Sequence, residues 1–248
     1  MAEQPIRAVA AVGEPAAVLL DAMGTLLTFA EPAPLLRAAL RERIGADVGA
    51  EAAACAIRSE IAFYRAHLHT GRDAASLAAL RRASAEAMRP QLGPAADAPA
   101  DVLTDALLAS LRFVAFPDAP PALRAMRAAG LRLVVVSNWD ASLEQRLAET
   151  GLAPLLDGVV ASAPFGAAKP DPAIFARALE LAGVDAAAAW HVGDSEREDV
   201  AGARAAGVAP LLLRRAGGDA PANVPVIRSL AELSVVLRRG EYPCPVRR

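Results

Sequence analysis

The feature that most constrains this chain is a long helical block placed between the first strand signal and all the later ones. Short apolar runs typical of buried strands occur at residues 17–20, 131–136, 158–161, 189–192, 209–213 and, more weakly, 225–227. Helical segments at 121–129, 142–150, 172–182 and 199–206 separate the later runs. Strand–helix–strand spacing of this kind predicts right-handed crossovers and a parallel α/β sheet with helices on both faces.

The block after the first strand shows helical periodicity and no good strand up to about residue 111. Its expected helices cover residues 34–44, 52–67, 75–88 and 99–111. A helical insertion directly after the first strand requires a core built from both ends of the chain. We therefore predict a catalytic core of residues 1–30 and 112–248, with a helical cap of residues 31–111 inserted into it.

Composition limits the classes of function. The 248 residues are 54% hydrophobic, enough for a sizeable core, and the net charge of −2 gives nucleic-acid binding no support. The arginine pairs 81–82, 214–215 and 238–239 are interpreted as solvated charges. The apolar runs are of strand length and do not predict a membrane span.

The cysteines and the first residues indicate the cellular compartment expected for this chain. Cys55 and Cys244 lie far apart without metal-binding spacing, which favours two free thiols in a reducing compartment. Residues 1–14 lack the charged region and apolar run of a signal peptide. We expect a cytoplasmic protein, monomeric or homodimeric, that acts on a small molecule.

Ligands of open α/β sheets bind at the carboxyl ends of the strands, so the residues there are the candidate site. Strand signals are followed by Asp21, by Ser137 and by Asp194, while Lys169 and Asp199 lie in neighbouring loops. Mg²⁺ prefers oxygen ligands and one or two carboxylates, which Asp21 and Asp194 supply. Ser137 offers a hydroxyl donor and Lys169 a positive charge to a phosphoryl group, and Asp21 can attack phosphorus.

Four segments that occur in order resemble the motifs of the haloacid dehalogenase superfamily. They are Leu19-Leu20-Asp21-Ala22-Met23-Gly24-Thr25-Leu26, Val135-Val136-Ser137-Asn138, Lys169-Pro170 and Gly193-Asp194 with Asp199. The resemblance implies a Rossmannoid core and a helical cap between the first two motifs. It implies Asp21 as nucleophile, with Ser137 and Lys169 stabilising the phosphate or the intermediate.

The resemblance also implies a magnesium site. Asp21, Asp194 and the backbone carbonyl of Met23 would hold the ion, with Asp199 behind them or reaching it through water. We expect Gly24, Thr25 and Asn138 to lie against the substrate. The acidic residues 196 and 198 are interpreted as the solvated start of a helix.

Met23 departs from the pattern of the family's phosphatases, which usually carry a second aspartate at that position. That aspartate protonates the leaving group, a contribution of about 10²–10⁴-fold, and a thioether cannot replace it. The main hypothesis is a magnesium-dependent phosphatase, slow or helped by an acid from elsewhere. The alternatives are a 2-haloacid dehalogenase, whose branch also lacks this aspartate, and a non-catalytic binding or regulatory module.

A polar cluster in the expected cap is the remaining candidate. His67, His69 and Arg72 surround a helix end near Tyr64. They are interpreted either as polar residues at a helix terminus, or as a turn facing Asp21. In the second case Arg72 pairs with an anionic substrate group and His67 or His69 replaces the missing acid. His191 is expected to be a packed strand residue, and Trp139 to line the pocket entrance or cover the core.

Overall fold

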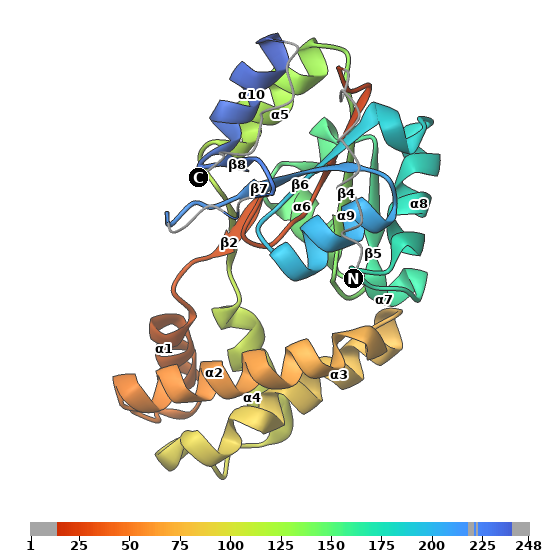
Figure 1. Ribbon diagram of the computed structural model, residues 1–248. Helices are drawn as coiled ribbons and strands as arrows, with labels where there is room; N and C mark the ends of the chain where they lie inside the picture. Colours follow the sequence, from red (N-terminus) through yellow and green to blue (C-terminus); the bar gives the residue numbers. More distant parts are fainter. Residues whose placement is uncertain (1–13, 218–220, 222, 240–248) are drawn as a thin grey trace, which may run out of the picture.

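The computed structural model describes residues 14–217, 221 and 223–239. Its central element is a six-stranded parallel sheet in the order β5-β4-β1-β6-β7-β8. The strands are β1 (Ala17–Leu20), β4 (Arg132–Ser137), β5 (Gly158–Ala161), β6 (Ala189–Gly193), β7 (Ala209–Leu213) and β8 (Val226–Ile227). The predicted parallel α/β fold is therefore confirmed, with the first strand in the interior of the sheet (Figure 1).

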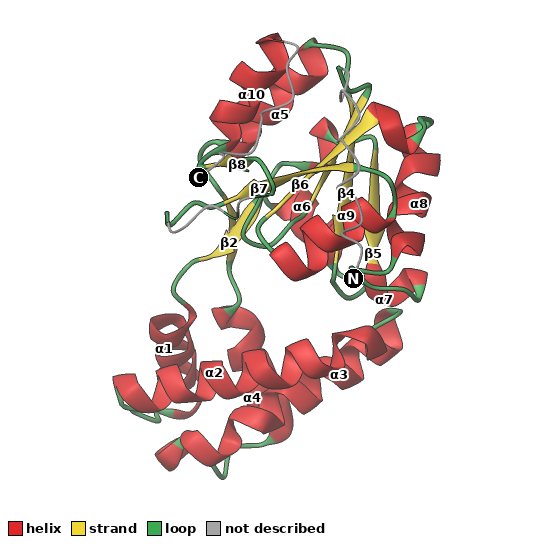
Figure 2. Cartoon of the chain, in the orientation of Figure 1, coloured by secondary structure: helices red, strands yellow, loops and turns green. Residues whose placement is uncertain are grey.

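Both faces of the sheet are buried, which explains why the strands read as continuous apolar runs. On β1, Val18 and Leu20 belong to one hydrophobic cluster, while Ala17 and Leu19 belong to another. The first cluster includes residues of α5 (Ala119–Ala128), α6 (Leu143–Glu149) and α10 (Leu230–Arg239). The second includes residues of α8 (Pro172–Ala182) and α9 (Ala201–Ala205), so helices cover both faces (Figure 2).

Four long helices form a separate body below the sheet in the view of Figure 1. They are α1 (Pro32–Ile44), α2 (Ala50–His67), α3 (Ala74–Met88) and α4 (Ala100–Ser110), with 3-10 turns at η1 (Leu68–Thr70), η2 (Arg89–Gln91) and η3 (Gly93–Ala95). Their buried residues, from Leu36 to Leu107, form a hydrophobic cluster of their own. The predicted helical region inserted after the first strand is thus present, and it has a hydrophobic core of its own.

The predicted absence of strands before residue 111 is wrong at one place. β2 (Leu27–Phe29) pairs antiparallel with β3 (Phe113–Ala115), and this two-stranded ribbon carries the chain into and out of the helical region. Three residues are too few to show a two-residue period, and the partner strand lies on the far side of the insertion. The sequence therefore does not predict this pairing.

Two helical elements also differ from expectation. The segment predicted as one helix over residues 199–206 begins earlier, as a π-helical turn η6 (Glu196–Val200) that continues into α9. α10 was not predicted. The short α7 (Ser162–Phe165), η4 (Ala153–Leu155) and η5 (Ala186–Ala188) complete the described elements.

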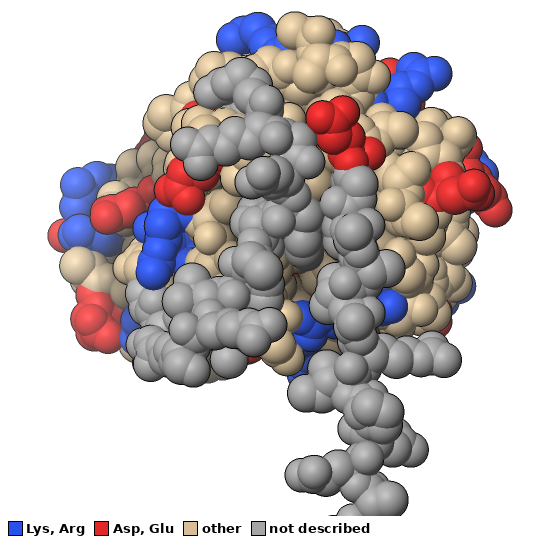
Figure 3. All heavy atoms as spheres, turned by 45° about the horizontal axis from the view of Figure 1, so that its top comes forward, with Lys and Arg blue, Asp and Glu red and all other residues tan. Residues whose placement is uncertain are grey.

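Three further observations concern the surface charges, the helices and the cysteines. Acidic and basic side chains are interspersed on the face shown in Figure 3 and do not gather by sign. Among the described residues, every helix is too short or too polar to cross a bilayer. Cys55 is a free thiol, whereas Cys244 lies outside the described residues.

Candidate active site

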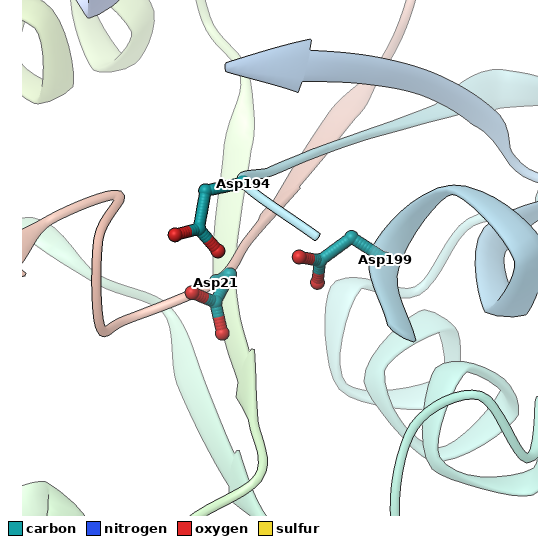
Figure 4. Close-up of side chains that lie close together, drawn as sticks. All are labelled: Asp21, Asp194 and Asp199. Atoms are coloured by element: carbon teal, nitrogen blue, oxygen red, sulfur yellow. The ribbon is translucent and has the colours of Figure 1, made fainter. Parts of the chain in front are cut away.

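Three aspartates meet at the carboxyl edge of the sheet because parallel strands end on the same side. Asp21 follows β1, Asp194 follows β6, and Asp199 lies in η6 immediately after it. Figure 4 shows the three carboxylates pointing toward one another. One ligand oxygen from each lies within 4.8 Å of those from the other two.

Lys169 is the positive centre of the site. Its Nζ donates to Asp21 Oδ1 at 2.6 Å and to Asp199 Oδ1 at 2.5 Å, and Ser137 Oγ donates to the same oxygen of Asp21 at 3.0 Å. Ser137, Lys169 and both aspartates are buried. Residues from four distant segments therefore form one hydrogen-bonded network, as the motif order predicted.

The three carboxyl groups of the site differ in the direction of their pKa shifts. Burial raises the pKa of Asp21 to about 6, with nearby Asp199 and Asp194 adding to the rise and Lys169 opposing it. Burial acts the same way on Asp199, but Lys169 and His191 outweigh it and hold the pKa of that carboxyl well below its ordinary value. Burial and the charge of Asp199 raise the pKa of Asp194.

These residues fit a divalent cation. Three carboxylates face a single ammonium group, so the cluster carries excess negative charge that a hard cation would neutralise. Burial is the main cause of the raised pKa values of Asp21 and Asp194, and the neighbouring carboxylates add to both. Asp194 is exposed, whereas the carboxylates of Asp21 and Asp199 are buried. A cation would therefore enter the cluster from the side of Asp194.

Two glycines permit this close approach of carboxylates. Gly24 has φ +82°, and a Cβ built on it would lie 2.1 Å from Asp194 Oδ2. A Cβ on Gly193 would lie 2.1 Å from Asp199 Cγ. Any side chain at either position would displace a carboxylate from the cluster.

Asn138 and Thr25, predicted to contact substrate, lie beside the network, and they differ in whether their side chains form hydrogen bonds. The Asn138 amide donates to the carbonyl of Lys169 and to Glu198, both at 3.0 Å, and its oxygen accepts from the Lys169 amide at 2.8 Å. This side chain holds the Lys169 loop in place. The Thr25 hydroxyl is buried and has no hydrogen-bond partner among the described residues.

Arg215 contacts the site in a way that the sequence does not indicate. Arg215 Nη2 donates to the carbonyl of Thr25 at 2.8 Å and Nε to that of Gly24 at 3.3 Å. Its third donor reaches Asp118 at 2.9 Å. Interpretation as a solvated charge is wrong here: Arg215 fixes the turn that follows Asp21. Only the fold reveals this, because Arg215 lies just beyond β7 on the same sheet edge.

Glu196 and Glu198 were interpreted as the solvated start of a helix; Glu196 begins η6 and is exposed, whereas Glu198 is partly buried. Glu198 accepts from Asn138, and Glu196 pairs with Arg214. His191 is packed in β6 as predicted, but it also contacts the site. Its Nε2 lies 2.9 Å from Asp199 Oδ1, and its ring meets Phe175 edge-on.

A cavity of about 280 Å³ opens between the sheet edge and the helical region, bounded by Met23 on the core side. Its wall is mostly apolar and aromatic, and it includes Trp139, so this residue both covers the core and lines the cavity. The lining residues are Met23, Phe29, Glu60, Ile61, Tyr64, Arg65, Arg81, Ser84, Leu107, Leu108, Leu111, Phe113, Trp139, Asp140, Ser142 and Arg146.

The predicted cap residues His67 and Arg72 are not among those lining residues. Both are exposed; His67 Nδ1 lies 2.8 Å from the carbonyl of Phe63, and Arg72 donates to that of His69. The turn itself does contact the core, since Gly71 accepts from the amide of Ala141 at 2.8 Å. Tyr64 OH also donates to Asp140 at 2.9 Å, which fixes the end of α2 against the loop after Ser137.

Comparison with known proteins places this geometry in a family. Residues 15–207 match the family model described as haloacid dehalogenase-like hydrolase. The chain belongs to this hydrolase family, and the resemblance drawn from the four motifs is confirmed.

Two curated relatives are similar over part of their length. A haloacid dehalogenase-like hydrolase domain-containing protein 3 from Bos taurus is 42% identical over 48% of this chain and 49% of its own length. A plasmid-encoded phosphoglycolate phosphatase from Cupriavidus necator is 43% identical over 43% of this chain and 46% of its own. The chain thus matches about half the length of these curated relatives.

Solved structures extend the likeness to nearly the whole chain. A HAD phosphatase from Thermococcus onnurineus and a 2-haloacid dehalogenase from Pseudomonas syringae are each 27% identical, with TM-scores of 0.62. They cover 91% and 90% of this chain, and 98% and 97% of their own. YfnB from Bacillus subtilis, bound to magnesium, has a TM-score of 0.70 at 20% identity over 91% and 99%. The fold therefore does not separate phosphatase from dehalogenase.

Proposed function

We propose that this hydrolase is a magnesium-dependent phosphatase that acts on a small phosphorylated metabolite through an aspartyl phosphate on Asp21. The observation that carries the proposal is the placement of Asp21. Its buried carboxylate accepts hydrogen bonds from Ser137 and Lys169. One of its oxygens lies within 4.8 Å of an oxygen of Asp194 and of Asp199, close enough for all three to bind one metal ion. The relatives that are phosphatases support the same choice.

The hydrogen bonds of Asp21 indicate which oxygen reacts. Ser137 and Lys169 both donate to Oδ1, and among the described residues Oδ2 accepts no hydrogen bond. Oδ2 is therefore available to attack phosphorus, which breaks the bond to the ester oxygen. The leaving oxygen takes its proton from water, because Met23 cannot supply one, and departs as an alcohol. Water then cleaves the aspartyl phosphate, giving inorganic phosphate and restoring Asp21.

Lys169 and Ser137 act on the transferring group. The ammonium of Lys169 neutralises charge on the phosphoryl oxygens, and the Ser137 hydroxyl can turn from Asp21 to donate to one of them. Magnesium, held by Asp21, Asp194 and the Met23 carbonyl with Asp199 nearby, would supply further charge neutralisation. Arg215 contributes indirectly, because it fixes the turn that carries the Met23 carbonyl.

The two alternative functions, a dehalogenase and a non-catalytic module, rest on the presence of Met23 in place of an acid. Without an acid at this position, a 2-haloacid dehalogenase activity also fits, since a halide leaves without a proton. The apolar wall beside Met23 favours that reading as well. A non-catalytic binding module is the third possibility.

The deciding experiment is a screen of small phosphate esters and 2-haloacids with and without magnesium. We expect magnesium-dependent phosphate release that Asp21→Asn lowers by at least about 10³-fold, because the nucleophile is lost. Asp101→Asn, at an exposed residue of α4, is the matched control and should leave the rate unchanged.

Each contrary outcome is informative. Halide release in the presence of a chelator would establish the dehalogenase instead. Magnesium binding without turnover of any ester would establish the binding module. Full phosphatase activity in Asp21→Asn would remove the proposed nucleophile.

A further inference from the structure

The cavity beside Met23 contains buried polar groups that the proposed chemistry does not use. Glu60, on α2, is 4% exposed, and Ser84, on α3, is 2% exposed. Both line the cavity together with apolar side chains such as Ile61, Leu107 and Phe113. A buried carboxyl group in an apolar wall is costly unless it has a partner.

Within the described part of the chain, no cation pairs with Glu60, and its polar neighbour is the neutral hydroxyl of Ser84. Of the arginines that line the cavity, Arg146 pairs with Glu149, and neither Arg65 nor Arg81 forms an ion pair with Glu60. The Ser84 hydroxyl is near enough to oppose the rise in the pKa of Glu60, yet it makes no hydrogen bond of its own among the described residues. Burial raises the pKa of Glu60 to about 7 despite that hydroxyl.

The cavity that contains Glu60 and Ser84 adjoins the proposed nucleophile, so these two residues can contact the leaving group. Met23 lies two residues after Asp21 and borders the same cavity, so a phosphate held at Asp21 would direct its ester group into this space. A volume of about 280 Å³ is slightly below the range of pockets that bury drug-sized ligands, which suits a small leaving group.

We infer that this cavity is the leaving-group subsite, and that Glu60 and Ser84 select an apolar or aromatic alcohol carrying one hydrogen-bond donor, a hydroxyl or an ammonium group. This inference rests on the proposed phosphatase function. The apolar wall takes the body of the group, and the donor satisfies the carboxyl of Glu60. A substrate without the donor leaves Glu60 buried and unpaired, and such a mismatch is what gives polar subsites their selectivity.

Matched aryl phosphates test the inference. We would compare phenyl phosphate with its meta and para hydroxymethyl and aminomethyl derivatives, and measure kcat/KM for each with magnesium. The best substituted ester should exceed phenyl phosphate by at least about tenfold, the effect of one hydrogen bond to a charged group. Ser84→Ala should reduce that ratio in part.

Variants of Glu60 distinguish the two donors. Glu60→Leu should bring the ratio to about one for both derivatives. Glu60→Gln should keep the preference for a hydroxyl, which an amide oxygen still accepts, and lose the preference for an ammonium group. Glu51→Gln, on the exposed side of the same helix, is the control and should preserve every ratio.

A binding measurement separates failure of this inference from failure of the proposed function. The phenols that these esters would release can be tested by thermal unfolding, which requires no turnover. Stabilisation by the aminomethyl or hydroxymethyl phenol but not by phenol, lost in Glu60→Leu, supports the subsite even if no ester is hydrolysed. Equal kcat/KM for all esters in the wild type, or ratios unchanged in Glu60→Leu, would overturn it.

Discussion

The two sides of the active-site cleft differ in how their polar groups are satisfied. On the core side, Asp21, Ser137, Lys169 and Asp199 bond to one another at 2.5–3.0 Å. On the helical side, Glu60 is buried and forms no ion pair with any described residue, and the buried Ser84 hydroxyl has no hydrogen-bond partner in the described part of the chain. The core therefore presents a hydrogen-bonded set of charged groups, whereas under the proposed function the helical region presents polar groups that a bound substrate would satisfy.

Met23 lies at the junction of the two sides, and its replacement gives the largest expected effect. Met23→Asp places an acid next to the leaving group, and we expect phosphatase turnover to rise by about 10²–10⁴-fold. The measurement is the initial rate on an alkyl phosphate, whose poor leaving group needs a proton, compared with an aryl phosphate.

Met23→Leu serves as the control, since it keeps the volume and supplies no proton. An equal rise for both esters would show that the missing acid does not limit the rate. No rise at all in Met23→Asp would show that the core side is not competent as it stands.

The next largest effect concerns the ion pairs of the core. Lys169→Met leaves Asp21 and Asp199 buried without their shared cation, and we expect the free energy of unfolding to fall by about 3–5 kcal/mol at neutral pH. Denaturant titration measures the change. Magnesium should recover part of the loss by replacing the positive charge, and unchanged stability would mean that the pairs contribute little.

Arg215 links the core turn to the C-terminal part of the sheet. Arg215→Met removes three hydrogen bonds and a guanidinium that lies 3.8 Å from the centre of the Phe116 ring. We expect a loss of about 2–3 kcal/mol in stability. Weaker magnesium binding in calorimetry should accompany it, because the turn holding the Met23 carbonyl is released. A stability loss with unaltered magnesium affinity would limit Arg215 to a structural role.

The smallest expected effect is a pH dependence of stability from the helical side. The folded pKa of Glu60, about 7, lies above its ordinary value of 4.5, so the folded protein retains a proton that the unfolded chain releases. Stability should therefore fall as pH rises from about 4.5 to 7. The charged groups that share its cavity are Arg65, Arg81, Asp140 and Arg146.

Glu60→Gln isolates this contribution. Its stability relative to the wild type should be greater at pH 8 than at pH 5, as measured by thermal unfolding at both values. A difference that does not change with pH would show that Glu60 stays ionised in the folded protein, with water or an arginine as its partner.

The sequence alone determined the core and the set of residues at its carboxyl edge. Buried strands of a parallel sheet need continuous apolar runs, and their carboxyl ends lie at one edge, so the strand signals placed Asp21, Ser137 and Asp194 together. The loops after the later strands added Lys169 and Asp199, and the resemblance to the family suggested their roles. The helical region was predicted from periodicity and from the lack of strand signals after β1.

Tertiary structure alone decided the contacts that depend on segments meeting without a local signal. β2 pairs with a strand beyond the whole insertion, and Arg215 reaches the turn after Asp21 from the end of β7. The sequence does not set Glu60 apart from other helical glutamates, yet the fold buries it, while His67 and Arg72 are exposed. The reason is physical: an amino-acid pattern fixes which face of an element is apolar, but burial of a single polar group depends on which other element packs against it.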